Sequence, residues 1–223
     1  SALCLVLLAA PAHALPLLRA NFYSYDPIGN IGGVAVADLD GDGHPDVVGT
    51  SASEGTVGVF MNRGDGQLAA RVSYPFSFNS APNGVAVGDV TGDGRPDLLV
   101  AGTGAGQVDL YPGLGGGRFG AALVLPCGGS PVSVRLADFN GDGRLDLATC
   151  LPFDERVEVR PGLPGGGLGG ALSLAVVGGP QNAVAVDLDG DTHLDLAVAC
   201  PNDDTIKILP GDGLGGFLPG VSL

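Results

Sequence analysis

Four short segments of the chain carry carboxylates at the same spacing. Each follows the pattern Asp-x-Asp-Gly-Asp-Gly-x-x-Asp or departs from it at one position, and the four segments span residues 38–46, 89–97, 138–146 and 187–195. Positions 1, 3 and 5 of such a tightly turned loop point their oxygens toward one centre. Ca²⁺ takes six to eight hard oxygen ligands at about 2.3–2.6 Å. The pattern therefore predicts up to four calcium sites.

Each predicted site takes side-chain oxygens from positions 1, 3, 5 and 9 and the backbone oxygen of position 7, while Gly at position 6 permits the sharp turn. The ligands of the first loop are Asp38, Asp40, Asp42, His44 (backbone O) and Asp46, and those of the second are Asp89, Thr91, Asp93, Arg95 (backbone O) and Asp97. Those of the third are Asp138, Asn140, Asp142, Arg144 (backbone O) and Asp146, and those of the fourth are Asp187, Asp189, Asp191, His193 (backbone O) and Asp195.

The four loops are not equivalent. Thr91 places a neutral, weaker oxygen donor at position 3 of the second loop, and Thr192 replaces Gly at position 6 of the fourth. The strand before the fourth loop also lacks one residue when the repeats are aligned at Gly33 and Ala183. Because a shift of one residue exchanges the two faces of a strand, we expect the 187–195 loop to be distorted and to bind calcium most weakly.

Two other structures could carry such loops, an EF-hand and a hairpin without metal. An EF-hand loop ends in Glu at position 12 between helices, whereas position 12 here is Gly49, Val100, Thr149 or Val198 and the flanks have the composition of strands. A hairpin without metal would leave clustered aspartates to repel one another. The recurrence of this aspartate cluster in four loops therefore favours calcium sites over hairpins without metal.

The loops mark an internal repeat. Their first aspartates are 51, 49 and 49 residues apart, which delimits units at about 33–83, 84–132, 133–182 and 183–223. A period near 50 residues is typical of β-propeller blades. We expect four short antiparallel strands in each unit: a small apolar strand before the loop, a strand after it, an alternating strand, and, beyond a Gly-rich turn, a fourth strand opened by Leu68, Phe119, Leu168 or Phe217. The predicted fold is all-β.

The third strand of each unit alternates between apolar and other residues. The alternate positions are Gly58, Asp109, Glu158 and Lys207, flanked on each side by Val, Leu or Ile. Period-two alternation indicates one buried and one solvated face.

The units resemble FG-GAP/VCBS repeats, the blade type of integrin α-subunit propellers. The resemblance covers about residues 20–223 and implies a propeller of about seven blades, with Ca²⁺ in the loop between the first and second strands. It implies a non-catalytic binding or adhesion module whose partner is an extracellular protein or glycan. The alternative is an accessory or catalytic propeller domain of a secreted hydrolase or lyase, although no catalytic motif, catalytic residue or organic cofactor site is recognisable.

The ends of the chain bear on ring size. Residues 21–25 precede the first unit and have the composition of a fourth strand, which they would add to the last blade where the ring closes. Residues 221–223, however, already begin a fourth strand for the last unit. Since both would fill one slot of a four-blade ring, we expect the four blades to be part of a larger ring. A closed four-blade ring is the alternative.

Composition restricts partners and location. The formal net charge is −14, and 14 of the 24 acidic residues lie in the loops, so nucleic-acid binding is not expected. Residues 1–14 contain a short apolar run followed by Ala12-His13-Ala14 and resemble the remnant of a signal peptide, with residues 15–32 as a lead-in. A buried N-terminal strand is the alternative. We expect a secreted or cell-surface monomer without a membrane span. Cys127, Cys150 and Cys200 leave a Cys127–Cys150 disulfide and three free thiols as alternatives.

Overall fold

The structure is a computed structural model that describes residues 29–76 and 81–222. It contains four four-stranded antiparallel sheets, so the predicted all-β class and the four strands per unit are confirmed. The predicted signal-peptide remnant and the predicted strand at residues 21–25 lie outside the described residues.

Each sheet, called a blade below, corresponds to one sequence repeat. Blade 1 contains β1 (Ile31–Ala37), β2 (Asp46–Ser51), β3 (Thr56–Phe60) and β4 (Val72–Pro75). Blade 2 contains β5 (Pro82–Gly88), β6 (Asp97–Gly102), β7 (Gln107–Tyr111) and β10 (Leu123–Pro126), with a small hairpin of β8 (Gly113–Gly115) and β9 (Arg118–Phe119). Blade 3 contains β11 (Ser133–Ala137), β12 (Asp146–Leu151), β13 (Arg156–Arg160) and β14 (Leu172–Ala175), with the 3₁₀ turn η1 (Pro152–Asp154). Blade 4 contains β15 (Asn182–Val186), β16 (Asp195–Cys200), β17 (Thr205–Leu209) and β18 (Val221–Ser222).

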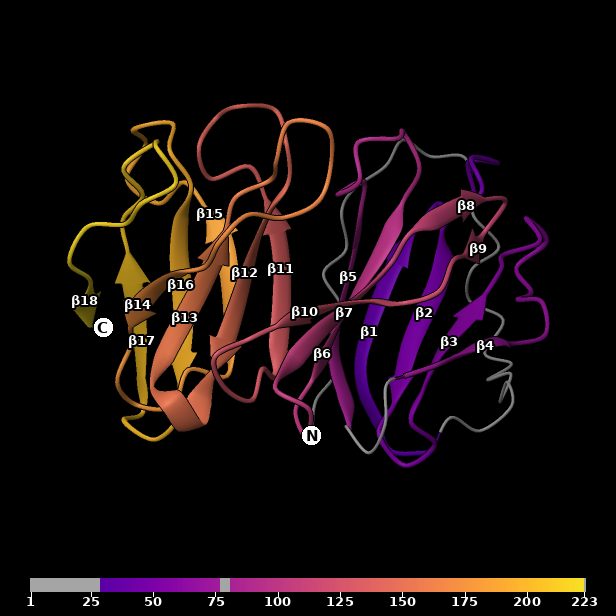
Figure 1. Cartoon of the computed structure of the whole chain (residues 1–223), viewed down its shortest axis with the longest axis horizontal. Helices are drawn as coiled ribbons and strands as arrows, with labels where there is room; N and C mark the ends of the chain where they lie inside the picture. The colour runs from indigo at the N-terminus through magenta and orange to yellow at the C-terminus, as the bar shows by residue number, and fades with distance from the viewer. Residues whose placement is uncertain (1–28, 77–80, 223) are drawn as a thin grey trace.

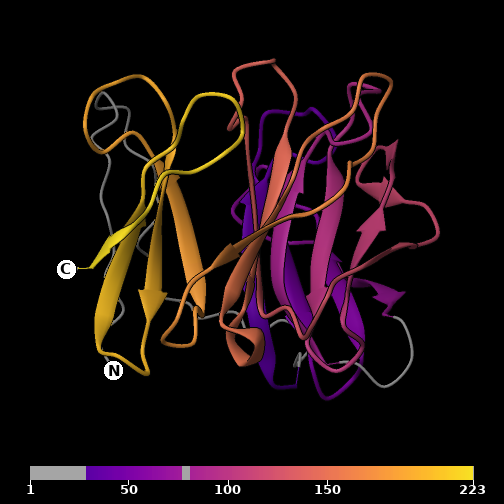
Figure 2. The same ribbon diagram turned by 60° about the vertical axis from the view of Figure 1, so that its left-hand side comes forward.

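The blades follow one another in chain order as a propeller-like row. The first strand of each blade contacts the first strand of the next, through β1 with β5, β5 with β11, and β11 with β15. Blades 1 and 4 lie at opposite ends of the row (Figure 1), and blade 4 remains at one end in the turned view of Figure 2. The first strands therefore form the shared inner edge of the assembly.

Small residues at this inner edge have a steric reason. A Cβ added to Gly33 would lie 2.5 Å from the backbone oxygen of Asn83, and one added to Gly84 would lie 2.7 Å from the Cα of Ser133. Real Cβ atoms do not approach other heavy atoms so closely, so neighbouring first strands require glycine here. The small residues expected in the first strand of each unit thus allow the first strands to approach one another closely.

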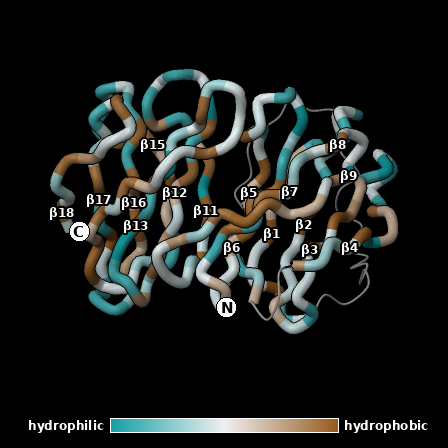
Figure 3. The backbone as a smooth tube through the Cα atoms, in the orientation of Figure 1, coloured by the Kyte–Doolittle hydropathy of each residue, from teal (hydrophilic) through white to brown (hydrophobic). Residues whose placement is uncertain are grey.

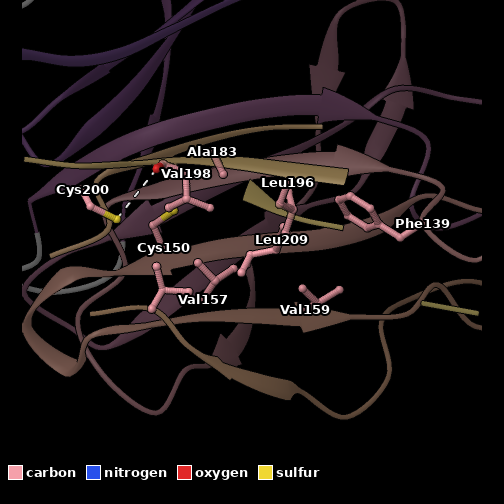
Figure 4. Close-up of a cluster of buried hydrophobic side chains, with 11 residues drawn as sticks. Phe139, Cys150, Val157, Val159, Ala183, Leu196, Val198, Cys200 and Leu209 are labelled. Carbon is pink, nitrogen blue, oxygen red and sulfur yellow. Dashed lines mark hydrogen bonds between the residues drawn. The ribbon is translucent and has the colours of Figure 1, made fainter. Parts of the chain in front are cut away.

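Apolar side chains are buried between consecutive blades. Figure 4 shows the cluster between blades 3 and 4, in which Cys150 and Val157 pack with Leu196, Val198 and Cys200. Equivalent clusters join blade 1 to blade 2 and blade 2 to blade 3. The hydropathy colouring in Figure 3 places the apolar stretches mainly in the strands and the polar ones in the loops at their ends. The stability of the fold thus depends on contacts between repeats.

The predicted solvated face of the third strands is wrong. Gly58 is buried, Asp109 is fully buried and Glu158 is 5% exposed. In blade 4, Ile206, predicted to be buried, is 50% exposed while Lys207 is half-buried. In the two middle blades, neighbouring blades cover both faces of the sheet. Each carboxylate has polar partners there: the Gln107 side chain donates to Asp109 at 2.6 Å, and the Gly128 N–H donates to Glu158 at 3.1 Å. Glu158 also forms ion pairs with Arg156 and Arg160.

Two further predictions are corrected. The residues expected to open the fourth strands instead close the preceding turn: Leu68, Leu168 and Phe217 form isolated bridges, and Phe119 belongs to β9. The fourth strands begin four residues later, at Val72, Leu123, Leu172 and Val221. Cys127, Cys150 and Cys200 are free thiols, so the Cys127–Cys150 disulfide is not formed.

Candidate calcium loops

The backbone of the first loop is wound tightly around the Asp38 carboxylate. Gly41 and Gly43 adopt φ angles of +83° and +84°, the left-handed region that favours glycine. Their N–H groups donate to the two Asp38 oxygens at 2.7 and 2.8 Å. The Gly43 N–H in particular holds the pKa of Asp38 below its ordinary value. The loop therefore keeps this carboxylate ionised and fixed.

Three carboxylates converge in the first and fourth loops. Oxygens of Asp38, Asp40 and Asp42 all lie within 4.8 Å of one another, and so do those of Asp187, Asp189 and Asp191. Such a set of hard, negatively charged oxygens fits Ca²⁺. The second and third loops have only two carboxylates at these positions, because position 3 is Thr91 or Asn140.

The turn geometry recurs in the other three loops. The position-1 carboxylate accepts an N–H from position 6 in each of them: Gly94 to Asp89 at 2.8 Å, Gly143 to Asp138 at 2.7 Å, and Thr192 to Asp187 at 3.0 Å. The second loop differs at position 3, where the Thr91 hydroxyl donates to Asp97 at 3.4 Å instead of joining the carboxylates of positions 1 and 5.

The distortion predicted for the fourth loop is wrong as far as register is concerned. The residue before position 1 pairs with position 9 in every blade: Ala37 with Asp46, Gly88 with Asp97, Ala137 with Asp146 and Val186 with Asp195. The strand before the fourth loop is one residue short only if Ala183 is aligned with Gly33. The hydrogen-bonded pairing of β15 with β16 places Ala183 at the position that Val34 has in blade 1, and no residue is missing. What distinguishes this loop locally is Thr192, which adopts φ +76° where the other loops have glycine.

The aspartates at position 9 lie in different surroundings from the rest. Asp46, Asp97, Asp146 and Asp195 are at most 2% exposed. One oxygen of each accepts the N–H of position 2, at 2.8–2.9 Å, and the other accepts an N–H from the turn after the third strand, at 2.7–2.9 Å. Burial raises the pKa of Asp146, and the N–H bonds from Gly162 and Phe139 oppose this shift. These four carboxylates tie the loop to the blade, a role that their position in the motif does not reveal.

At position 7 the backbone, not the side chain, belongs to the loop. The N–H of His44, Arg95, Arg144 and His193 each donates to the position-5 carboxylate at 2.8–3.0 Å. The side chains lie outside the turn, where Arg144 and His193 contact Asp142 and Asp191. This placement accounts for the variable side chain expected at position 7.

The Gly-rich turn of the following blade covers the first three loops. The Gly117 N–H donates to the Leu39 oxygen at 3.3 Å, and the Gly167 N–H donates to the Val90 oxygen at 2.9 Å. Phe217 packs edge-on against Phe139, with the ring centroids 5.5 Å apart. Leu188, the equivalent residue of the fourth loop, is 51% exposed. In the sequence, the glycine runs at 115–117 and 165–167 are the one feature that could have indicated this contact between a turn and the loop of the preceding blade.

Comparison with known proteins agrees with this architecture. The family model of the FG-GAP-like repeat matches residues 38–100 and 89–149, which together make up just over half of the chain. The fold and the repeated loops define a propeller-type repeat protein, and the chain belongs to the FG-GAP-like repeat family. A comparison with curated protein sequences found no match. None of the described residues forms a helix long and apolar enough to span a bilayer.

Solved structures show the same fold. A lectin of Agrocybe aegerita, described as recognising non-reducing terminal N-acetylglucosamine, is 27% identical with a TM-score of 0.58 over 84% of this chain and 50% of that chain. BBS1N, solved in complex with ARL6DN, is 14% identical with a TM-score of 0.60 over 88% of this chain and 58% of that one. Virginiamycin B lyase of Staphylococcus aureus is 13% identical with a TM-score of 0.53 over 89% of this chain and 71% of that one. The chain thus spans about half the length of the first two structures.

Proposed function

We propose that this chain is a calcium-binding, non-catalytic propeller module of a secreted or cell-surface protein, and that it binds a glycan. The observation that carries the calcium proposal is the convergence of three carboxylates within 4.8 Å in two loops whose backbone turn recurs four times. Like charges held this close in a loop destabilise it unless a cation compensates them. Positions 1, 3 and 5, the backbone oxygen of position 7 and the Asp at position 9 would hold the ion.

In this proposal calcium has a structural role. The four loops join the first and second strands of their blades, and three of them contact the next blade. Ions bound there would stiffen the loops and the contacts between blades. The apolar run followed by Ala12-His13-Ala14 supports export, since a leader of this kind directs a chain out of the cytosol.

The likeness to the lectin supports a glycan as the ligand. Among the structures described above, it combines the higher sequence identity with coverage of most of this chain. An extracellular protein is the other partner predicted from the sequence.

Calcium binding is tested by thermal unfolding. We expect the melting temperature to rise with CaCl₂ and fall with EDTA, since a ligand of the folded state at 100 times its Kd contributes about 2.7 kcal/mol per site. MgCl₂ at the same concentration is the control and should have a smaller effect. A melting temperature unchanged between EDTA and CaCl₂ would contradict the calcium proposal.

Glycan binding is tested on a glycan array that includes terminal N-acetylglucosamine. We expect binding in CaCl₂ and weaker binding in EDTA. An array without any bound glycan, together with capture of a defined extracellular protein, would replace the glycan by a protein partner.

A further inference from the structure

The inner edge of the row contains a polar pocket that all four blades help to form. Its volume is about 400 Å³, within the range of small-molecule sites of about 300–1,000 Å³. Residues of β1, β5 and β11 line it, together with residues at the start of β15. We call it the axial pocket. Its polar side chains are Asn83, Ser133, Arg135, Gln181 and Asn182.

The charge of the axial pocket is opposite to that of the chain. The chain has 24 acidic and 10 basic residues, yet among the described residues no Asp or Glu lines the pocket, and Arg135 is the one charged residue of that described lining. Unlike the calcium loops, the pocket therefore favours an anion.

Arg135 is held in place by neutral groups. Its Nε donates to the Ala183 oxygen at 2.7 Å, Nη2 to the Asn182 Oδ1 at 2.8 Å, and Nη1 to the Val134 oxygen at 3.2 Å. Among the described residues, none of the ion pairs includes Arg135. A guanidinium has five N–H donors, so two remain for a ligand, and its charge is not compensated by a carboxylate.

The repeat itself does not require an arginine at this position. The equivalent residues of the other first strands are Ala35, Ala86 and Val184. The junctions of blades 1 to 3 are joined by smaller groups: the Thr50 hydroxyl donates to the Asn83 oxygen at 2.7 Å, and the Gly84 N–H donates to the Val132 oxygen at 3.0 Å. The first two junctions therefore form without an arginine, and Arg135 distinguishes the junction of blades 3 and 4.

We propose that the axial pocket binds a carboxylate-bearing sugar, with Arg135 contacting the carboxylate and the carboxamides of Asn83, Gln181 and Asn182 contacting hydroxyl groups. A guanidinium whose orientation is already fixed can take a carboxylate through two parallel N–H bonds. Asn182 uses its Oδ1 for Arg135, which leaves its amide nitrogen as a donor. The inference rests on the proposed function, since it names the class of glycan and the place where it binds.

The test is an NMR titration of the calcium-loaded chain with D-glucuronate, D-glucose and acetate. We expect D-glucuronate to bind at least tenfold more tightly than D-glucose, and acetate to bind more weakly than D-glucuronate because it offers no hydroxyl groups. Acetate binding as tightly as D-glucuronate would mean a plain carboxylate site and would overturn the sugar assignment. Equal affinity for D-glucose and D-glucuronate would overturn the role of Arg135.

Variants distinguish binding of the carboxylate by Arg135 from its structural contact with blade 4. Arg135→Gln keeps a hydrogen-bond donor and loses the charge, and we expect it to weaken D-glucuronate binding at least tenfold. Arg118→Gln is the matched control, since Arg118 is exposed on β9 outside the pocket, and it should bind as the unaltered chain does. Asn83 lies on another blade, and among the described residues no hydrogen bond joins its side chain to Arg135. A several-fold weaker affinity of Asn83→Ala at an unchanged melting temperature supports the pocket even if Arg135→Gln is unstable.

The outcome is distinguishable from that of the proposed function. An unchanged D-glucuronate affinity in Arg135→Gln overturns the inference. If a neutral glycan from the array binds Arg135→Gln as it binds the unaltered chain, the lectin-like function stands and the axial assignment fails. The effect of calcium on melting is measured without sugar and depends on neither result.

Discussion

The aspartates at positions 1, 3 and 5 and the aspartate at position 9 belong to the same loop, but their surroundings are opposite. Asp40 and Asp42 are exposed and converge with Asp38 on one centre. Asp46 is fully buried and accepts the N–H groups of Leu39 and Asn62 at 2.9 and 2.7 Å. The first group lacks enough internal partners to balance its charge, whereas the last carboxylate has both oxygens occupied by backbone donors.

The difference separates two tasks within one motif. Under the proposed function the exposed carboxylates gain stability from a cation, so their contribution should depend on calcium. The buried one stabilises the fold through hydrogen bonds that exist without an ion, and its free lone pairs still allow it to take part in a calcium site. Variants at the two kinds of position should therefore respond differently to calcium removal.

The largest effect is expected from Asp46→Ala. The variant leaves the buried N–H of Leu39 and the part-buried N–H of Asn62 without an acceptor. An unsatisfied buried N–H costs about 1–3 kcal/mol and a part-buried one less, so the free energy of unfolding should fall by about 1–5 kcal/mol even in EDTA. Asp42→Ala is the matched control and should change it by within about 0.5 kcal/mol in EDTA, because water replaces the lost acceptor at an exposed site. Urea unfolding measures both. Equal losses for the two variants would contradict the division of tasks.

The calcium-dependent part should be unequal between loops. In saturating calcium, Asp38→Ala should remove the increment of the first site, about 2.7 kcal/mol at 100 times Kd. We expect Asp187→Ala to remove less, since the fourth loop has Thr192 in a strained conformation and Leu188 exposed at its base. Calorimetric titration with CaCl₂ gives the affinities and the stoichiometry. A loss for Asp187→Ala as large as that for Asp38→Ala would reverse this ranking.

A smaller effect is expected from Thr192→Gly. Thr192 adopts φ +76°, which glycine adopts without steric cost, so the substitution should stabilise the chain by about 1 kcal/mol. The reciprocal variant Gly143→Thr, at the same position of the third loop with φ +82°, should destabilise it by a similar amount. Thermal unfolding of both variants in EDTA measures the backbone strain without the contribution of calcium. If the melting temperature shifted in the same direction for both variants, strain at Thr192 would be refuted.

The smallest effect concerns pH, and its sign differs between the two kinds of aspartate. The pKa of Asp38 is lowered by the Gly43 N–H, so its stabilising contribution is present above the ordinary pKa and is lost as the pH falls through the folded-state value. Burial raises the pKa of Asp146 above its ordinary value, so above the raised pKa the ionised carboxylate lowers the stability of the fold. As the pH falls from the raised pKa to the ordinary pKa, Asp146 becomes protonated in the folded state and this loss of stability disappears. A ¹³C NMR titration of the calcium-free carboxyl groups should place Asp146 above Asp38. Asp38→Asn and Asp146→Asn assign the two signals.

Much of the fold followed from periodicity. The spacing of Asp38, Asp89, Asp138 and Asp187 delimited the blades, because a repeat that buries its apolar faces against its neighbours must recur at the period of the sheet. The alternation around Asp109 and Glu158 misled, since a period of two tells which residues share a face but not whether another sheet covers that face. The sequence pattern predicts that Leu68 and its equivalents open the fourth strands, whereas they close the preceding turn. The position of a turn within a Gly-rich stretch depends on backbone hydrogen bonds that residue types do not specify.

The sequence by itself determined the four loops, their calcium-type spacing and the all-β repeat, because all three are local properties of neighbouring residues. Only the tertiary structure decided that position 9 is a buried acceptor, that β15 before the fourth loop keeps its register, and that Arg135 borders an axial pocket whose described lining includes no acidic residue. The first two depend on backbone hydrogen bonds between the strands and turns of one blade, and the third arises where strands about 50 residues apart in sequence are brought together. Residue types alone do not encode which groups meet there.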